Sequence, residues 1–247
     1  MVLSWRVNKE ISLPLMFVDL DKDGNSNTTE RLDLLKEFDE VFGFDRMNSL
    51  TADREFVGCR WFKTLNKHKI PYFIRIKQNT LLPWGDEPIQ ARELFSHLKG
   101  YQTRLVEKEM YESIAYFAGV TSQSGELVIV MSNQPLTPSQ ILMKYLKRWS
   151  IEELFRKLKT SGFHWENTHM TKAARLVTLL IIVTFALMCA SIVGYGQPIP
   201  WKKTLGCHLY SVFKQGLITL QFLLAKSLNL ALQTIQAAFE RIQNVIG

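Results

Sequence analysis

The first part of the chain alternates short apolar runs with amphipathic stretches, which predicts strands and helices in turn. Apolar runs rich in β-branched and aromatic residues predict strands, and apolar positions spaced three and four apart predict helices. In chain order the predicted elements are strand 11–20, helix 27–42, strand 47–56 with a turn at Asp53, helix 55–67 and strand 71–77. Asn27, with Glu30 three residues later, has the capping-box pattern of a helix start. This order of elements predicts an α/β sheet.

After residue 78 the pattern changes. A loop is predicted at 78–88 and a short helix at 91–98; strand-like segments follow at 103–120 and 126–133, with a turn between them. We interpret residues 79–125 as a small β-rich insertion, after which the chain returns to the main sheet. Pro138 marks the start of a mostly helical remainder. The predicted division is therefore 1–78, 79–125 and 126–247.

The segment Asp19–Glu30 imitates a calcium loop. It matches the EF-hand pattern at Asp19, Asp21, Asp23, Gly24 and Glu30. An EF-hand also needs a helix on each side of the loop, whereas a Pro-containing strand is predicted before this segment. No second loop of this kind occurs in the sequence. We therefore predict a strand-to-helix turn stabilised by Gly, Asn and Asp.

Composition favours a folded protein with a polyanionic partner. Hydrophobic residues make up 47% of the chain, enough for a packed core, and the formal net charge is +7. A positive excess of this kind favours nucleic acid or an acidic membrane face. The three cysteines are far apart and form no CxxC pair, which favours a reducing cytosol over a disulfide framework.

The segment Tyr145–Lys159 carries most of the candidate chemistry. On one continuous helix, Tyr145, Arg148, Glu152 and Lys159 share a sector of about 60°, beside an apolar stripe. A solvated amphipathic helix with ion pairs would give the same periodicity. Alternatively, the Ser150–Glu153 capping box restarts the helix, which would leave Tyr145 and Arg148 on a preceding segment.

Four stretches together resemble one family. The spacing Y-x2-R-x3-E-x6-K, the Gly24–Asn27 G-N-S-N turn, the Asp53–Phe56 D-R-E-F motif and the run Ser161–Thr171 occur in the expected order. In these features the chain resembles bacterial insertion-sequence transposases of the DDE type, in the branch named after insertion sequence four. The resemblance covers nearly the whole chain.

The resemblance implies an RNase-H-like mixed sheet flanked by helices, with a small β-rich insertion and a helical C-terminal part. It implies that Asp53 and Glu152 are catalytic and hold Mg²⁺ or Mn²⁺, two ions in the complete family site. Two such ions activate the attacking oxygen and stabilise the leaving oxygen of a phosphodiester. Tyr145, Arg148 and Lys159 match the residues that bind DNA phosphates near the cut.

The implied function is metal-dependent DNA strand cleavage and strand transfer at the ends of a mobile element. The implied partners are double-stranded DNA, as terminal inverted repeats and target, and a second copy of the chain. The expected location is the bacterial cytoplasm, associated with the nucleoid, with no membrane. The family's first catalytic Asp matches no residue here and is expected upstream of Met1, so we predict a truncated transposase that is inactive alone.

Two rival functions remain open. Residues 176–195 are long and apolar enough to span a membrane, although the resemblance favours a helix buried on all sides. The chain could instead be a non-catalytic DNA-binding remnant. The basic residues that would hold DNA are Arg75, Lys77, Arg148, Arg156, Lys157 and Lys159.

The remaining candidates favour structural roles. Residues 220–246 predict an amphipathic helix, which we expect to pack on the domain rather than on a partner. His164 and His169 lack a third ligand, and we expect them to be solvated or structural. For Trp149 and Trp165, core packing is favoured over stacking on a base.

Overall fold

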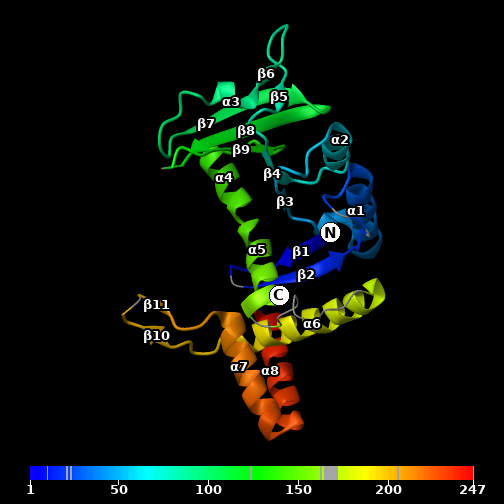
Figure 1. The fold of residues 1–247 in the computed structure, drawn as a ribbon, viewed down its shortest axis with the longest axis vertical. Helices are drawn as coiled ribbons and strands as arrows, with labels where there is room; N and C mark the ends of the chain where they lie inside the picture. The colour runs from blue at the N-terminus through cyan, green and yellow to red at the C-terminus, as the bar shows by residue number, and fades with distance from the viewer. Residues whose placement is uncertain are drawn as a thin grey trace. The chain divides into compact units, whose positions relative to one another are not determined.

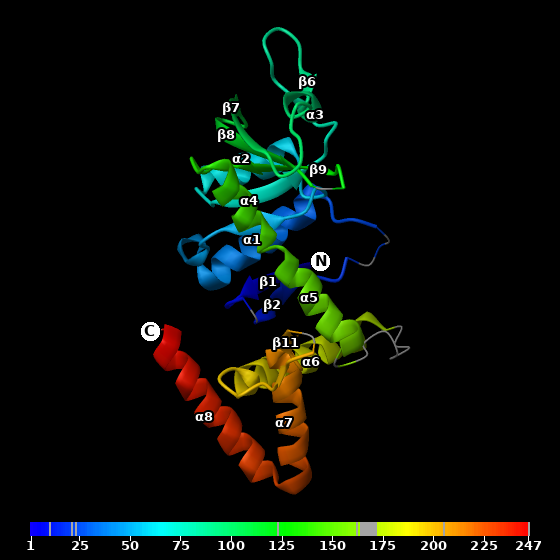
Figure 2. The same cartoon turned by 90° about the vertical axis from the view of Figure 1, so that its left-hand side faces the viewer.

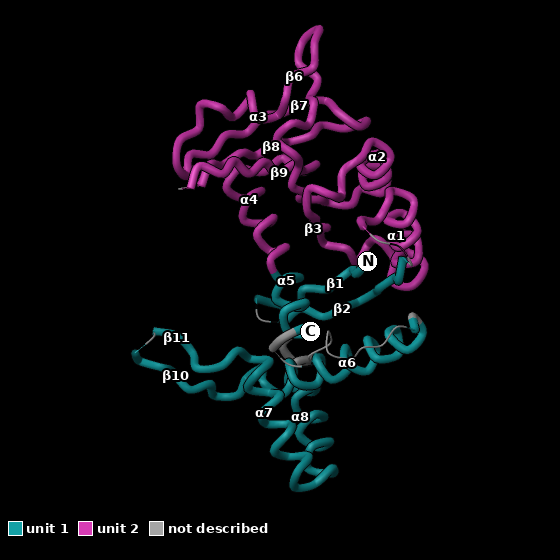
Figure 3. Tube along the Cα trace, in the orientation of Figure 1, with its two compact units in different colours: residues 1–21, 150–247 teal, residues 22–149 magenta. Residues whose placement is uncertain are grey.

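The computed structural model describes residues 1–9, 11–20, 22, 24–122, 124–161, 163, 172–204 and 206–246, and the chain forms two compact units (Figure 3). Unit 1 contains residues 1–21 and 150–247, and unit 2 contains residues 22–149. The chain has a mixed α/β architecture with a five-stranded mixed sheet flanked by helices and a helical C-terminal part. This confirms the predicted fold class and is consistent with an RNase-H-like transposase fold.

Unit 2 is built around the sheet. Its elements are α1 (Thr28–Phe42), a 3-10 turn (Phe44–Arg46), β3 (Leu50–Ala52), α2 (Cys59–Lys67), β4 (Tyr72–Ile76), β5 (Leu81–Leu82), β6 (Ile89–Gln90), α3 (Ala91–Leu94), β7 (Thr103–Met110), β8 (Ser113–Thr121), β9 (Leu127–Ser132) and α4 (Pro138–Leu146). The strand order is β3-β4-β9-β8-β7. β3 and β4 run parallel and are joined through α2, while the other neighbours are antiparallel. β9 lies beside β4, and β7 and β8, from the segment interpreted as an insertion, continue the same sheet on the other side of β9.

The sheet of unit 2 is covered on both faces. Ile141 and Tyr145 of α4 pack against Phe73, Ala118 and Val130 on one face, and Figure 1 shows α4 running away from the sheet. On the other face, the ring of Phe62 in α2 lies 5.3 Å from the ring of Tyr72. Because both faces are covered, β4 is apolar at successive positions, as central strands commonly are.

The predicted strand-like segment 103–120 is wrong in one respect, because it is two strands. A tight turn at Tyr111 and Glu112, with φ of 56° and 62°, separates β7 from β8. Both values are typical of a type I′ hairpin turn, which usually carries Asn and Gly. Here tertiary contacts hold the turn instead: the Tyr111 ring stacks on Phe62 at 4.9 Å, and Glu112 pairs with Lys63 at 2.6 Å.

Unit 1 combines a small sheet with helices. Its elements are β1 (Val2–Arg6), β2 (Ser12–Phe17), most of α5 (Trp149–Arg156), a π-helical segment (Lys157–Ser161), α6 (Ala173–Gly194), β10 (Trp201–Lys202), β11 (Cys207–His208), α7 (Val212–Lys226) and α8 (Leu228–Ile246). β1 and β2 form an antiparallel pair that includes Pro14, which confirms the strand predicted there. Leu154, Leu158, Leu187, Val193 and Phe213 are central to one apolar core.

The C-terminal helix predicted at 220–246 is interrupted at Ser227, whose backbone is extended at φ −166° and ψ 127°. As a result α7 and α8 form a helical hairpin rather than one rod, as both views show (Figures 1 and 2). Ala238 on α8 is buried in the core of unit 1. Helix α8 therefore packs on the core of its own unit, as expected from the sequence.

Helix α6 is enclosed on one side only. Leu187, Ala190 and Val193 are fully buried, but Ile182 is 59% exposed and Phe185 is 62% exposed. The prediction that this helix is buried on all sides is therefore wrong. Because its residues are apolar around the whole circumference, sequence periodicity could not indicate which side would be covered.

Candidate active site

Asp53 lies where β3 ends and the D-R-E-F turn begins. The carbonyl of Asp53 accepts a hydrogen bond from the Phe56 amide at 2.9 Å, and its Oδ1 accepts one from the Arg54 amide at 2.7 Å. The carboxylate therefore lies at the end of the edge strand β3, at the start of the β3–α2–β4 unit, and the turn predicted at Asp53 is confirmed. Gly58 (φ 155°) is the N-cap of α2, which begins at Cys59, four residues later than predicted.

The G-N-S-N turn lies against the D-R-E-F turn. Asn25 donates its side-chain amide to Glu55 at 3.4 Å. Arg31, which is buried, donates to the side chain and carbonyl of Ser26, and its guanidinium lies 4.6 Å from the centre of the Phe56 ring. Two motifs that are distant in sequence thus meet through Arg31, a residue that sequence reasoning missed because Arg usually lies on the surface.

The calcium-loop pattern has a different role. Strand β2 precedes the turn and α1 follows it, so the helix–loop–helix of an EF-hand is absent from this described part of the chain. Glu30 accepts a hydrogen bond from the Asn27 amide at 2.7 Å and pairs with Lys22 at 2.6 Å. The Lys22 hydrogen bond, followed by the Asn27 amide, lowers the pKa of Glu30. The predicted capping box is confirmed; Asp21 and Asp23 lie outside the described residues.

The single helix predicted over Tyr145–Lys159 is wrong. Helix α4 ends at Leu146, Arg148 lies in the intervening turn, and α5 begins at Trp149. The alternative with a helix restart near Ser150 is the one observed. Trp149 is 59% exposed, so its expected core packing is also wrong.

Tyr145 and Arg148 form a local pair at this break. The Arg148 side chain donates from Nε to the Tyr145 hydroxyl at 3.2 Å. Tyr145 is only 7% exposed and belongs to the core on α4. The core therefore fixes the aromatic ring, and the ring in turn orients the guanidinium.

Asp53 and Arg75 act electrostatically on the same tyrosine. Burial raises the pKa of the Tyr145 phenol; Arg148 opposes this shift, Asp53 adds to it, and Arg75 opposes it. Helix α4 contacts both β3, which ends just before Asp53, and β4, which carries Arg75, so these residues lie in one region of unit 2. The phenol stays protonated at neutral pH and can act as a hydrogen-bond donor.

Glu152 and Lys159 belong to unit 1. Glu152 lies in the first turn of α5, and Lys159 lies in the π-helical segment that follows. Leu154 and Leu158 between them anchor this stretch in the core of unit 1. Their place beside Asp53 therefore remains a prediction. Most of the run Ser161–Thr171, including His164, Trp165 and His169, lies outside the described residues.

A basic hollow of about 250 Å³ lies in unit 2, between the D-R-E-F turn, the end of β4 and α3. Its lining residues are Arg54, Arg75, Ile76, Lys77, Gln78, Asn79 and Arg92. Three of its cations pair with carboxylates: Arg75 with Glu126 at 2.7 Å, and Lys77 and Arg54 with Glu55 at 3.6 and 3.9 Å. Sequence reasoning had singled out Arg75 and Lys77, but it missed Arg92, which lies some fifteen residues further along the chain and meets the others only after folding.

Asp53 in unit 2 and Glu152 in unit 1 each carry a carboxylate, the kind of ligand that Mg²⁺ prefers. Within the described ranges no group of three or more His, Cys, Asp or Glu side chains is arranged to hold a metal ion. The matched motifs therefore supply two candidate metal-binding carboxylates in this chain, Asp53 and Glu152.

The fold and the site together define an α/β domain in which a carboxylate lies among side chains suited to binding phosphate. Residues 10–189, most of the chain, match the family described as "Transposase DDE domain". The chain belongs to this DDE transposase family, which generally uses divalent metals and acts on DNA. Comparison with curated proteins finds no match.

Proposed function

We propose that this chain is the catalytic region of a transposase of the insertion-sequence-four branch, and that Asp53 and Glu152 are its catalytic carboxylates. The observation that carries the proposal is a contact within unit 2: helix α4 lies against β3, the strand that ends just before Asp53, and Tyr145 of α4 accepts a hydrogen bond from Arg148. Burial raises the pKa of Tyr145 most, and the Asp53 carboxylate raises it further. A carboxylate beside an orienting phenol and a guanidinium matches the needs of a phosphodiester bound next to a cation.

Arg148 is suited to the phosphate itself. A guanidinium presents paired N–H donors that match two phosphate oxygens, and such charge-assisted bonds are strong. Tyr145 accepts from Arg148 and retains its own O–H, which can donate to a further phosphate oxygen. Lys159 would add a point charge from the segment after α5.

Asp53 and Glu152 would hold Mg²⁺ or Mn²⁺ in this proposal. When bound, the cations supply activation of the attacking oxygen and stabilisation of the leaving oxygen. What Asp53 contributes itself is a fixed anion at the end of β3, held by the Arg54 amide. Its carboxylate orientation is therefore set before any ligand binds.

The basic hollow supports double-stranded DNA as the partner. Arg54, Arg75, Lys77 and Arg92 would receive the phosphate backbone beyond the cut. In this proposal residues 1–78 and 126–247 form the catalytic domain around a 79–125 insertion. The protein would act in the bacterial cytoplasm on nucleoid DNA, where its substrates would be the element's terminal repeats and the target. It would act as a homodimer.

We also propose that this chain does not complete cleavage by itself. The family set has three carboxylates, and the matched motifs assign only Asp53 and Glu152 here. The expected result is DNA binding without strand cleavage when the purified chain receives Mg²⁺. Cleavage of the element's own terminal repeats under these conditions would overturn this part of the proposal.

Replacing Arg148 by alanine tests the phosphate-binding role. We expect DNA affinity to fall about tenfold. The negative slope of log affinity against log salt should become shallower by about 1, because one phosphate contact is lost. Fluorescence anisotropy with a short labelled duplex in EDTA measures both quantities. Arg46→Ala is the matched control, since Arg46 is exposed on the 3-10 turn. An equal effect of both variants, or binding that ignores salt, would contradict the assignment.

A membrane protein is the second candidate function, and one observation favours it. Residues Ala174–Gly194 of α6 form a helix long and apolar enough to cross a membrane, and 39% of its most apolar window is buried. The family match, however, runs into this helix as far as residue 189. We therefore expect the chain to leave the membrane fraction on alkaline carbonate washing. Retention in the carbonate-washed pellet would favour the membrane function.

A further inference from the structure

The C-terminal part of the chain has an unusual charge distribution. Between residues 167 and 239 there is no Asp or Glu, whereas Lys and Arg occur six times. They are Lys172, Arg175, Lys202, Lys203, Lys214 and Lys226. The chain's total excess of +7 is therefore concentrated here. A long stretch without carboxylates presents an uncompensated positive surface to a polyanion.

Two of these lysines lie on a small ribbon between α6 and α7. Trp201 pairs with His208, and Lys202 pairs with Cys207, in an antiparallel ladder. The ribbon closes through the Gly206 amide, which donates to the Lys202 carbonyl at 3.1 Å with Gly206 at φ 61°. Its base is held by the Leu209 amide donating to Pro200 at 2.8 Å. The ribbon is thus ordered by its own backbone rather than by a core.

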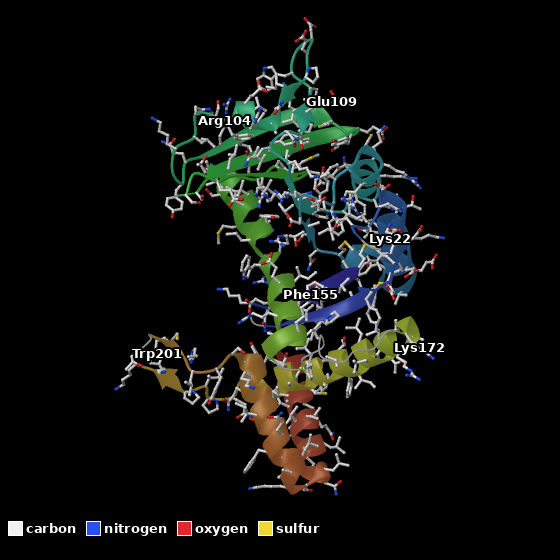
Figure 4. All side chains as sticks on the ribbon, in the orientation of Figure 1. Lys22, Arg104, Glu109, Phe155, Lys172 and Trp201 are labelled. Atoms are coloured by element: carbon white, nitrogen blue, oxygen red, sulfur yellow. The ribbon has the colours of Figure 1, made fainter. Side chains whose placement is uncertain are left out.

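Large apolar side chains of the ribbon are exposed. Trp201 is 56% exposed, Leu209 45% and Tyr210 38%. Figure 4 labels Trp201 on the ribbon, which extends away from α7 in Figure 1. The Trp201 ring lies edge-on to the His208 ring, at 5.0 Å between centroids. Exposed apolar and aromatic side chains gathered in one short, ordered segment are typical of a binding surface.

Lys202 and Lys203 are both exposed beside this cluster. The ion pairs found among the described residues include neither lysine. Aromatic rings together with unpaired ammonium groups suit nucleic acid, since rings stack on bases or sugars and ammonium groups bind phosphates. A two-stranded ribbon also has the width that a DNA major groove admits.

We propose that the β10–β11 ribbon is a second DNA-binding element, separate from the Asp53 site. Lys202 and Lys203 bind backbone phosphates, and Trp201 stacks on an adjacent base or sugar. The choice of DNA as the occupant rests on the proposed function, because DNA is the substrate of that function. The ribbon's residues themselves take no part in the proposed cleavage.

The test uses the full chain and a short labelled DNA duplex of arbitrary sequence, with EDTA present to exclude cleavage. The double variant Lys202→Gln, Lys203→Gln is expected to lose about tenfold in affinity or more, with a salt slope smaller by about 2. Trp201→Ala is expected to lose about fivefold or more, and Trp201→Phe to keep most of the affinity. All three positions are exposed, so thermal unfolding of the variants should match that of the parent chain.

The matched control is Lys36→Gln with Lys67→Gln, two exposed lysines of α1 and α2 with the same total charge change. An equal loss in this control would show a general charge effect and overturn the proposal. Unchanged DNA binding combined with lost binding to anionic phospholipid vesicles would also overturn it, in favour of a membrane surface. Because cleavage and metal binding are not measured, failure of the Asp53 site would leave this result intact.

Discussion

Replacing Asp53 by asparagine is expected to reduce Mn²⁺ affinity at least about tenfold. The amide keeps the shape of the side chain and can still accept from the Arg54 amide, but it removes the negative charge that a hard cation requires. Electron paramagnetic resonance of free Mn²⁺, titrated with the full chain, gives the affinity directly. Glu152→Gln is expected to act in the same direction.

The same Asp53→Asn variant is not expected to lose DNA affinity. Without metal, loss of a negative charge beside Tyr145 and Arg148 removes repulsion of the phosphate, so DNA affinity should stay equal or rise. A variant that merely misfolds would lose both activities. The surface control is Asp33→Asn on α1, where Asp33 is exposed. Unchanged Mn²⁺ binding by Asp53→Asn would remove this residue from the proposed site.

Replacing Gly216 by valine is expected to destabilise unit 1 by about 3 kcal/mol or more. A Cβ at Gly216 would lie 1.8 Å from the Ala190 carbonyl oxygen, and one at Gly194 would lie 2.0 Å from that of Val212. The two glycines thus let the α6 and α7 backbones touch. The obstacle is backbone rather than a flexible side chain, so the helices must separate and open the core around Leu187 and Phe213.

Denaturant unfolding followed by circular dichroism measures this change in the free energy of unfolding. Gly216→Ala should also destabilise, although alanine is the better helix former by about 1 kcal/mol. The control is Gly100→Ala, because a Cβ there meets no atom within 4 Å. If Gly216→Ala were as stable as the parent chain, the close α6–α7 contact would be disproved.

Much of the local structure was predictable from sequence. The Asn27–Glu30 capping box, the helix start at Pro138 and the strand that became β4 were all identified, because each depends on neighbouring residues alone. The predictions failed where contacts between residues far apart in the sequence determine the structure. The Tyr111–Glu112 turn lacks the Asn-Gly signal and is held by Phe62 and Lys63 of α2.

The candidate site shows the same division. The motifs were enough to indicate the chain's family, whereas the grouping of Glu152 with Tyr145 and Arg148, predicted from their spacing, stays a prediction. Sequence alone left two alternatives at Arg148, because the periodicity continues through the break while the Ser150–Glu153 capping box predicts a restart; the structure decided for the break. Sequence also could not reveal that Arg31 joins the G-N-S-N and D-R-E-F turns, since the meeting of two loops depends on the packing between them.

The sequence by itself determined the α/β class, the order of most elements, the DDE family and the positive charge of the C-terminal part. Only the tertiary structure decided that Asp53 lies with Tyr145, Arg148 and Arg75, that α6 is covered on one side, and that the Trp201 ribbon stands exposed. The physical reason is the distance along the sequence over which each interaction acts. Helix caps, strand patterns and motifs are set within a few residues, whereas burial and electrostatic neighbours depend on segments that meet only in the folded chain.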